Sequence, residues 1–355
     1  MTLLITGASG FIGSRLALYA RREGLAVRAT GVVNTAHEAT RVRDLSTAGI
    51  QVILGQLQEP EFAARLLEGV DRVIHLAAAQ HEANVPDSYF HGVNVIGTRT
   101  LLDASMNAGV QRFVYGSTIG VYGSAARGRL DEATPAQPDN IYGRTKLEAE
   151  GVVQSFATRL ATTIVRISET YGPGDFRLLK LFKGIERRRF FVIGSGMNQR
   201  QVIHVDDLAR GLLLASHHPQ APGQLFVFAG AEVMTTNEMV GLVAQALDTQ
   251  PHGFKVPMWP FMTAAVMMEK TLKPLGIQPP LHRRRLDFFR KSFFFSTEKT
   301  HELLGFRATI PFSRGVREAA EWYRQQGLLL KGPRSAASVP RPEGARRDEV
   351  GRCSN

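Results

Sequence analysis

Cysteine is almost absent from this chain. Cys353, close to the C-terminus, is the single cysteine among 355 residues. One cysteine cannot form a disulfide within the chain, which excludes the small secreted folds that are held together by disulfides. We therefore expect a reducing compartment and a cytoplasmic protein.

Long apolar runs are missing as well. The longest apolar stretch in the second half covers residues 258–268 and is interrupted by Pro260. A membrane-spanning helix requires roughly 20 apolar residues, so we expect no transmembrane segment. The N-terminus enters a strand-like run at once, without the basic region and cleavage site of a signal peptide.

Acidic residues are fewer than basic ones, 32 against 43, which gives a net charge of +11. The basic residues are not interleaved with stacking aromatic residues in one stripe, so we expect no nucleic-acid partner. The runs at 187–189 and 283–285 are typical of a solvated basic face, and an anionic substrate or a peripheral membrane contact stays open. The ten histidines form no H-x-x-x-H pair with an acid, which predicts no metal site.

A glycine-rich turn follows the first apolar run. Residues 3–13 read LLITGASGFIG, with Gly7, Gly10 and Gly13 evenly spaced, and residues 14–22 have helical periodicity. A strand, a glycine turn and a helix place a helix N-terminus against a phosphate. By itself the motif is equally compatible with an ordinary turn, so its interpretation depends on the rest of the chain.

The first half alternates strand-like and helix-like segments. This order predicts an α/β fold, a Rossmann-type doubly wound parallel sheet with a smaller C-terminal substrate lobe. Strands are expected after the glycine turn at residues 25–30, 51–54, 72–78, 112–117, 162–167 and 224–229. Helices are expected around residues 89–108, 142–160 and 208–215, the last capped by Asp206 or Asp207.

The same pattern predicts the division of the chain. We expect residues 1–172 and 201–229 to form the NAD(P)-binding domain, and residues 173–200 and 230–330 to form the substrate lobe. Residues 331–355 are rich in Pro, Gly, Ser and Arg, which predicts a disordered basic tail.

A second group of residues carries reactive side chains. Tyr142 and Lys146 are four apart on an expected helix, so they lie on one face. An ammonium beside a phenol favours the phenolate, and such a tyrosine can exchange a proton with a secondary alcohol or a ketone. Ser117 or Thr118, at the end of the preceding strand, can polarise the same carbonyl while a nicotinamide exchanges the hydride.

With these motifs, the chain resembles an extended short-chain dehydrogenase/reductase of the NAD-dependent epimerase/dehydratase family, over about residues 2–328. The nearest branches are the 3β-hydroxysteroid/sterol dehydrogenases and the dihydroflavonol reductases. The resemblance also rests on HLAA at 75–78, NVIGT at 94–98, YGPG at 171–174 and HVDD at 204–207. It implies Thr118, Tyr142 and Lys146 as catalytic residues, a largely structural role for HVDD, and a homodimer built on two helices. The cofactor contacts that it implies are Gly7, Gly10, Phe11, Ile12, Gly13, Leu57, Ala77, Asn94, Tyr142 and Lys146.

The cofactor is NADP or NAD. Relatives that prefer NAD usually carry an acid at the end of the second strand, for the ribose 2′-hydroxyl. Residues 28–34 read RATGVVN and contain none. We therefore favour NADP, with Arg28, Arg41 and Arg43 as the nearby cations, and expect Gln56 to reach the adenine.

Two enzyme functions compete for the substrate end. We favour an oxidoreductase for a hydrophobic alcohol or ketone (sterol-, flavonoid- or acyl-like), because the second lobe is rich in Met and Phe. The alternative is a nucleotide-sugar epimerase or dehydratase that retains NAD. Glu169 is a poor neighbour for a diphosphate, whereas Arg200 and Arg284 match arginines that grip one. Together with Ser117 these are the candidate substrate residues; a catalytically inactive regulator is disfavoured by the intact reactive groups.

Overall fold

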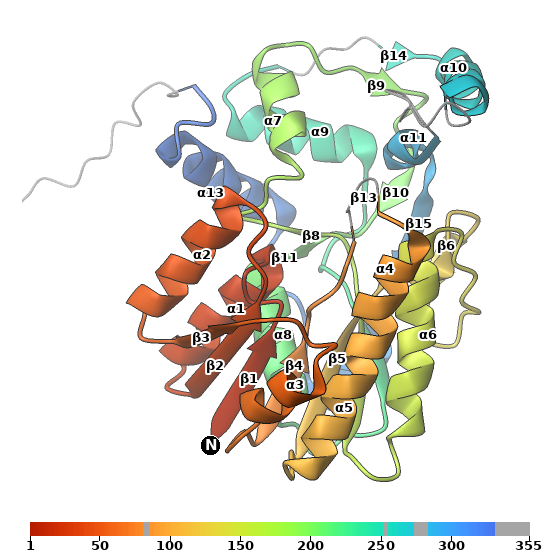
Figure 1. The fold of residues 1–355 in the computed structure, drawn as a ribbon. Helices are drawn as coiled ribbons and strands as arrows, with labels where there is room; N and C mark the ends of the chain where they lie inside the picture. Colours follow the sequence, from red (N-terminus) through yellow and green to blue (C-terminus); the bar gives the residue numbers. More distant parts are fainter. Residues whose placement is uncertain (81–84, 251–254, 273–282, 331–355) are drawn as a thin grey trace, which may run out of the picture.

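A seven-stranded parallel sheet forms the centre of the molecule. The computed structural model describes residues 1–80, 85–250, 255–272 and 283–330, and the strand order is β12-β7-β5-β4-β1-β2-β3 (Figure 1). The strands are β1 (Thr2–Thr6), β2 (Ala26–Gly31), β3 (Gln51–Leu54), β4 (Arg72–His75), β5 (Arg112–Thr118), β7 (Thr162–Ile167) and β12 (Leu225–Phe228). Among the described residues, no helix is both long enough and apolar enough to cross a bilayer.

Helices cover both faces of this sheet, which explains why its strands are nearly continuous apolar runs. One buried cluster joins the sheet to α1 (Phe11–Arg22), α2 (Ala36–Thr47) and α8 (Val205–Ala215). A second joins the other face to α3 (Pro60–Leu66), α5 (Gly97–Asn107) and α6 (Ile141–Ser155). The predicted Rossmann-type fold class is confirmed.

Several boundaries differ from the sequence-based expectation. Helix α1 begins at Phe11, inside the glycine motif, rather than at residue 14. Strand β4 ends at His75 rather than at residue 78, because the next two N–H groups, of Leu76 and Ala77, donate to the hydroxyl of Thr6 instead of extending the ladder. The predicted N-cap of α8, Asp206 or Asp207, is wrong. His204 is the N-cap and accepts from the Asp206 N–H, while both aspartates lie in the first turn of the helix.

Helix α2 and helix α3 were not predicted from the sequence. Only Leu45 of α2 is buried, so apolar periodicity gives little signal there. Its N-terminus does carry a capping box, a Thr followed three residues later by a Glu. The Thr35 hydroxyl accepts from the Glu38 N–H, and the Glu38 carboxylate accepts from the Thr35 N–H. This cap is the sequence feature from which α2 was predictable.

The expected helix over 89–108 is interrupted by a change of winding. The chain is helical from α4 (Asp87–His91) through a π-helical turn, η1 (Gly92–Ile96), into α5. A π turn inside an α-helix often accompanies a functional site. Here it carries Asn94, one of the expected cofactor residues.

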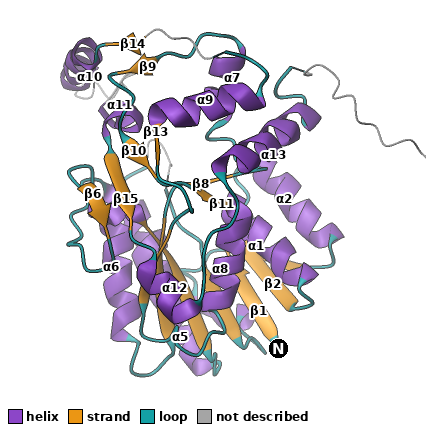
Figure 2. Cartoon of the chain, turned by 180° about the vertical axis from the view of Figure 1, so that it is seen from behind, coloured by secondary structure: helices purple, strands orange, loops and turns teal. Residues whose placement is uncertain are grey.

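Most of the remaining described elements lie above the carboxyl ends of the strands, as the back view shows, whereas α12 (Glu298–Leu304) lies lower, against the sheet (Figure 2). A buried cluster joins α7 (Leu179–Glu186), α9 (Thr236–Ala246) and α13 (Phe312–Gln325). The other helices are η2 (Ile119–Tyr122), α10 (Met258–Leu272), α11 (Arg283–Arg290) and α12 (Glu298–Leu304). Short strand pairs complete this part: β6 (Arg127–Leu130) with β15 (Ser292–Phe295), β8 (Thr170–Tyr171) with β11 (Ile203–His204), β9 (Val192–Ile193) with β14 (Lys255–Val256), and β10 (Gln199–Arg200) with β13 (Met234–Thr235).

The two expected parts of the chain interleave in space. Strand β12 lies in the central sheet, and Leu304 of α12 with Phe306 packs into the core of the sheet rather than into the upper cluster. The domain boundaries remain a prediction, and the expected disordered tail at 331–355 lies outside the described residues.

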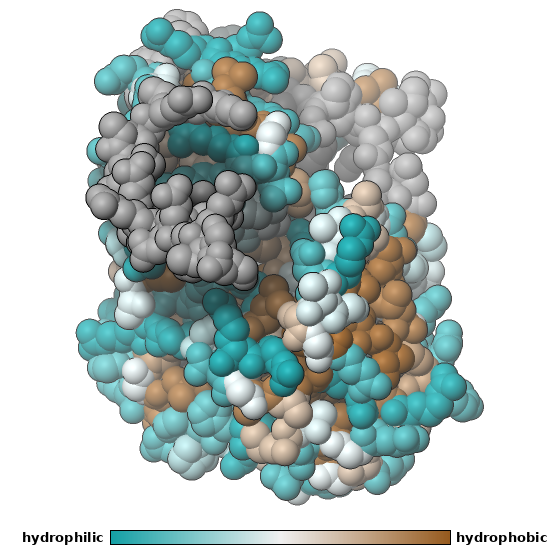
Figure 3. All heavy atoms as spheres, turned by 90° about the vertical axis from the view of Figure 1, so that its left-hand side faces the viewer, coloured by the Kyte–Doolittle hydropathy of each residue, from teal (hydrophilic) through white to brown (hydrophobic). Residues whose placement is uncertain are grey.

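Seen from the side of α2 and α13, apolar side chains gather along the right-hand edge of the molecule (Figure 3).

Candidate functional site

A cavity of about 630 Å³ runs along the carboxyl edge of the central sheet. Ligands of open α/β sheets bind at this edge. Most of the sequence-predicted residues line this cavity: Gly7, Gly10, Phe11, Ile12, Gly13, Leu57, Ala77, Ser117, Thr118, Tyr142, Lys146 and Glu169. Sequence positions up to about 160 residues apart are therefore gathered by the parallel strands around one space.

The glycine turn has the close contacts that a pyrophosphate site requires. Gly7 has φ +68°, and a Cβ there would lie 2.7 Å from the Ala77 nitrogen. A Cβ on Gly13 would lie 2.3 Å from the Gly7 carbonyl oxygen, so α1 could not pack against the turn. Gly10 caps α1 without a side chain, which leaves the first N–H groups of the helix open to an anion. The turn therefore fits a dinucleotide.

Three reactive groups lie at the other end of the cavity. Thr118 ends β5, and its hydroxyl accepts from the Gly120 N–H at 3.0 Å. Tyr142 and Lys146 come from the first turns of α6, which Asn140 caps by accepting from the Gly143 N–H. The cap fixes where α6 begins and therefore how both side chains enter the cavity.

Lys146 is buried with an uncommon neighbour. Its side chain is 1% exposed, and Nζ lies 4.0 Å from the centre of the Tyr115 ring. Burial lowers the pKa of Lys146 to about 7, against an opposing effect of Glu150. Burial also raises the pKa of Tyr115, so this phenol stays neutral beneath the lysine.

Glu150, one turn beyond Lys146, was missed by the sequence analysis. Its carboxylate receives Arg166 Nε at 3.1 Å and Nη2 at 2.8 Å, and the Ser117 hydroxyl donates to it. The Glu150 and Arg166 side chains are 3% and 7% exposed. Burial acts against the charge of Arg166, but Glu150 holds the pKa of Arg166 above its ordinary value. Ser117 therefore supports this ion pair from the cavity wall.

A second buried network connects the glycine turn to α6. His75 bridges the Thr6 hydroxyl at 2.7 Å and the Thr98 hydroxyl at 2.9 Å. Asn94 continues it, accepting from the Ala79 N–H at 2.8 Å and donating to Thr145 at 2.9 Å. Asn94 therefore lies behind the cavity wall, where it fixes the positions of wall residues; its contact with the cofactor stays a prediction.

The end of the cavity beside the close of β2 contains one of the three expected cations. Arg41 donates to the carbonyl oxygens of Gly174 at 2.9 Å and Ser9 at 3.3 Å, whereas Arg28 and Arg43 are not among the lining residues. Arg28 instead donates to Leu66 and Glu68. Gln56 also lines the cavity, as do His37 and Phe176, whose rings stack with centres 3.8 Å apart.

Two candidate substrate residues form an ion pair with each other. Arg200 Nη1 donates to the Glu169 carboxylate, and the Arg200 side chain is 8% exposed. In the sequence these two residues favour opposite substrates, and only the fold, which pairs β11 with β8, brings together the segments that precede these strands. Arg284 belongs to α11, but its side chain lies outside the described residues.

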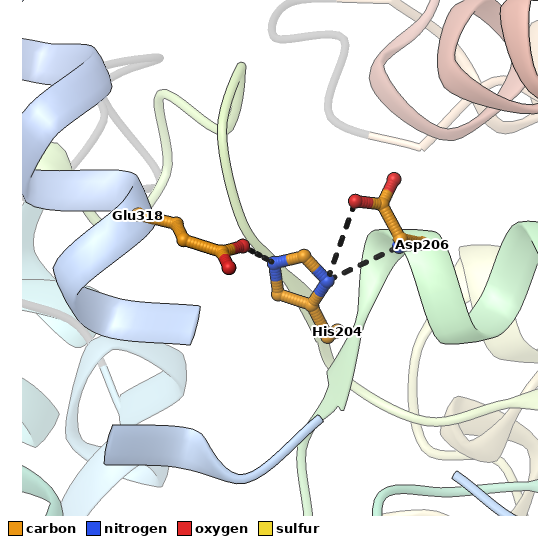
Figure 4. A group of neighbouring side chains, drawn as sticks. All are labelled: His204, Asp206 and Glu318. Carbon is orange, nitrogen blue, oxygen red and sulfur yellow. Dashed lines mark hydrogen bonds and ion pairs between the residues drawn. The ribbon is translucent and has the colours of Figure 1, made fainter. Parts of the chain in front are cut away.

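A further cluster lies beside the cavity. His204, Asp206 and Glu318 place one ligand atom each within 4.8 Å of one another, the kind of group that can hold a metal (Figure 4). Both carboxylates already have arginine partners: Arg15 reaches Asp206 at 2.5 and 2.8 Å, and Arg314 reaches Glu318 at 2.8 Å. The cluster joins α1, α8 and α13, and the largely structural role expected for HVDD stays a prediction.

The chain matches the family model of the NAD dependent epimerase/dehydratase family over residues 3–229. It is 28% identical over 363 residues to the dTDP-glucose 4,6-dehydratase of Streptomyces antibioticus, covering 97% of this chain and 100% of the relative. It is 31% identical to the 4-hydroxy-2-methyl-3-oxo-4-farnesyl-3,4-dihydroquinoline-1-oxide ketoreductase of Stigmatella aurantiaca, covering 96% and 99%. Similarity extends at 26% identity to the 3beta-hydroxysteroid-dehydrogenase/decarboxylase isoform 2 of Arabidopsis thaliana, covering 95% and 64%.

Among solved structures, the fold is similar to that of DesIV, a dTDP-glucose 4,6-dehydratase from Streptomyces venezuelae with NAD and TYD bound. The TM-score is 0.74 at 26% identity, covering 93% of this chain and 99% of that chain. The resemblance therefore includes sugar-nucleotide enzymes as well as enzymes of apolar substrates.

Proposed function

The chain belongs to the NAD-dependent epimerase/dehydratase family, and on this premise we propose that it is an NAD(P)-dependent oxidoreductase of a secondary alcohol or ketone. One observation carries the proposal. Thr118, Tyr142 and Lys146 line the same cavity as the glycine turn. Hydride transfer to a carbonyl requires a nicotinamide and a group that exchanges a proton with the carbonyl oxygen. A cavity that contains both a dinucleotide site and such a group suits this reaction.

In this mechanism, a bound nicotinamide supplies or accepts the hydride. In the reducing direction the Tyr142 hydroxyl donates a proton to the substrate oxygen, and the Lys146 ammonium stabilises the phenolate that forms. The Thr118 hydroxyl donates to the same oxygen and polarises the carbonyl. Glu150 and Tyr115 do not touch the reacting atoms, but they set the surroundings of Lys146.

Residues already in place would hold the dinucleotide. The open N–H groups at the start of α1 suit the pyrophosphate, and Gln56 with Leu57 lines the adenine end. We favour NADP because β2 ends in Gly31 rather than an acid, and because Arg41 lines the cavity. The structural relative with bound NAD keeps NAD as the alternative cofactor.

An apolar carbonyl compound is the substrate class that we favour. The ketoreductase and the sterol dehydrogenase among the relatives support it. Dehydration of a sugar requires a further acid and base to remove a C–H proton and to protonate the departing hydroxyl. Ile119 and Gly120, which follow Thr118, offer neither. The carboxylates that line the cavity are all engaged: Glu38 by the α2 cap, Asp175 by Arg177 and Glu169 by Arg200.

Nucleotide-sugar epimerisation or dehydration is the second candidate. The dTDP-glucose dehydratases among the relatives favour it, as does the place of Arg200 beside the cavity. In this alternative the protein retains NAD through each turnover, whereas a net oxidoreductase must exchange its cofactor. The absorbance spectrum of the purified protein distinguishes a retained cofactor from an exchanged one.

The decisive assay follows the absorbance of NADPH and NADH with two panels of substrates. We expect consumption of the reduced cofactor with apolar ketones and none with UDP- or dTDP-sugars. Conversion of a sugar nucleotide without net cofactor consumption would instead establish the second candidate.

We also propose a homodimer built on α5 and α6. Ile96, just before α5, is 47% exposed. An exposed large apolar side chain beside helices that can pair across a twofold axis suits such an interface. Light scattering on the eluted protein measures its mass, and a monomer at micromolar concentration would contradict the proposal.

A further inference from the structure

All three nitrogens of the Arg200 guanidinium donate to groups of its own chain. Nη1 donates to Glu169, while Nε and Nη2 donate to the carbonyl oxygen of Phe288 at 3.3 and 3.0 Å. The Phe288 ring covers one face of the guanidinium, with its centre 4.2 Å from Cζ. Arg200 is therefore a buried cation whose charge already has a carboxylate partner.

Glu169 differs from Arg200 in its exposure. Its side chain is 52% exposed, and it lines both the large cavity and a smaller one beside it. The cations lining the smaller cavity are Arg200 and Lys291. Lys291 is also paired, with Asp287 at 3.5 Å. Among the described side chains of this smaller cavity, each positive charge therefore has its own carboxylate.

We propose that Glu169 determines specificity at the substrate end, by closing it to phosphate-bearing substrates and accepting a hydrogen bond from a neutral hydroxyl or amide group. The proposal rests on the proposed function and narrows its substrate class. The expected substrate is an uncharged alcohol or ketone that carries a second hydrogen-bond donor away from the reacting carbon.

The physical reason is that a diphosphate and Glu169 would compete for the same cation, Arg200. A diphosphate that approached Arg200 would have to displace Glu169, and the displaced carboxylate would stay nearby as a like charge in a partly desolvated space. A neutral donor meets no such repulsion, because it can bond to Oε1 of Glu169, the oxygen that does not accept from Arg200, while the ion pair stays intact. The side chain thus favours one substrate class and disfavours the other.

The substitution Glu169→Gln tests this directly. It keeps the size of the side chain and removes the charge that neutralises Arg200. The matched control is Glu298→Gln, which removes a carboxylate paired with Arg129 at 2.7 Å, on the exposed start of α12 and outside both cavities. The double variant Glu169→Gln with Arg200→Gln shows whether any new binding passes through Arg200.

The measurement is isothermal titration of each folded variant with UDP, at a saturating concentration of NADPH so that the glycine turn is occupied. We expect weak binding, with a dissociation constant of about 1 mM or above, in the native protein and in Glu298→Gln. In Glu169→Gln we expect roughly tenfold to hundredfold tighter binding, which the double variant loses.

Two results would overturn the proposal: tight UDP binding by the native protein, or a folded, NADPH-binding Glu169→Gln variant that does not gain UDP affinity. Failure of the proposed function is read separately. It shows as an absence of binding when NADPH and NADH are titrated alone into the native protein, or as unchanged turnover after substitution of Tyr142.

Discussion

The ammonium nitrogen of Lys146 lies 4.0 Å from the centre of the Tyr115 ring, in a site where the lysine side chain is 1% exposed. The π face of the ring attracts the cation, but the ring cannot replace the water that burial removes. The resulting low pKa, about 7, means that Lys146 changes its charge within the physiological range. The end of the cavity that contains Lys146 is therefore held at a cost in stability, which leads to the following predictions.

Replacing Tyr142 by Phe should remove the proton donor and leave the shape of the cavity unchanged. We expect turnover to fall by about 10²- to 10⁴-fold, while the dissociation constant for NADPH changes by less than about threefold. Steady-state assays and cofactor titration measure the two effects. Tyr19→Phe, on the outer part of α1, serves as a control. Near-native turnover of Tyr142→Phe would show that another group transfers the proton.

Replacing Lys146 by Met should abolish turnover and raise stability at neutral pH. The pKa of Lys146 is lower in the folded protein than in the unfolded chain, so the unfolded chain binds more protons between pH 7 and about 10.5. Native stability therefore rises with pH through this window, by a few kcal/mol. Urea unfolding should show that the advantage of Lys146→Met is largest near pH 7 and shrinks towards pH 10. A constant difference would contradict the charge argument.

Replacing Glu150 by Gln should leave Arg166 as a buried charge without its carboxylate. We expect a loss of about 3–5 kcal/mol in the free energy of unfolding. Without Glu150, the pKa of Lys146 should also fall further, which moves the alkaline limb of the pH–rate profile to lower pH. The control Glu148→Gln, on the same helix but 52% exposed beside His91, should cost less than about 1 kcal/mol. Equal losses in the two variants would contradict the prediction.

Replacing His75 by Gln should make the protein less sensitive to acid. Burial lowers the pKa of His75 from 6.5 to about 3, so the unfolded chain binds more protons between these values. Native stability is therefore lost as the pH falls through that window, by up to about 1.4 kcal/mol per pH unit. Melting temperatures between pH 7 and about pH 4 should fall less steeply in His75→Gln than in the native protein. His301→Gln, an exposed histidine on α12, should follow the native curve.

Replacing Arg41 by Gln should separate the two cofactors. If Arg41 moves from its carbonyl partners to a 2′-phosphate, its loss should weaken NADPH binding by roughly tenfold to hundredfold. NADH binding should change little, and Arg43→Gln, whose side chain is exposed outside the cavity, should change neither. Fluorescence titration with both cofactors gives the ratio. Equal weakening for NADPH and NADH would show that Arg41 recognises a part common to both.

Much of the site was predictable because its chemistry is local in sequence. The spacing of Gly7, Gly10 and Gly13 reflects contacts within a single turn. The four-residue spacing of Tyr142 and Lys146 follows from one turn of helix. The signal for Glu150 was present too, four residues further along the same helix face, but a glutamate in an amphipathic helix ordinarily faces solvent.

The sequence by itself determined the strands of the central sheet, the glycine turn and the reactive groups of α6, because each depends on neighbours within a few residues. Only the tertiary structure decided the partners of the buried charges. Glu150 meets Arg166, and Glu169 meets Arg200, because parallel strands and short ladders bring distant segments together. In water each of these charges would be solvated independently. Inside the fold each depends on its partner, and that dependence is the basis for the proposed exclusion of a diphosphate from the substrate end.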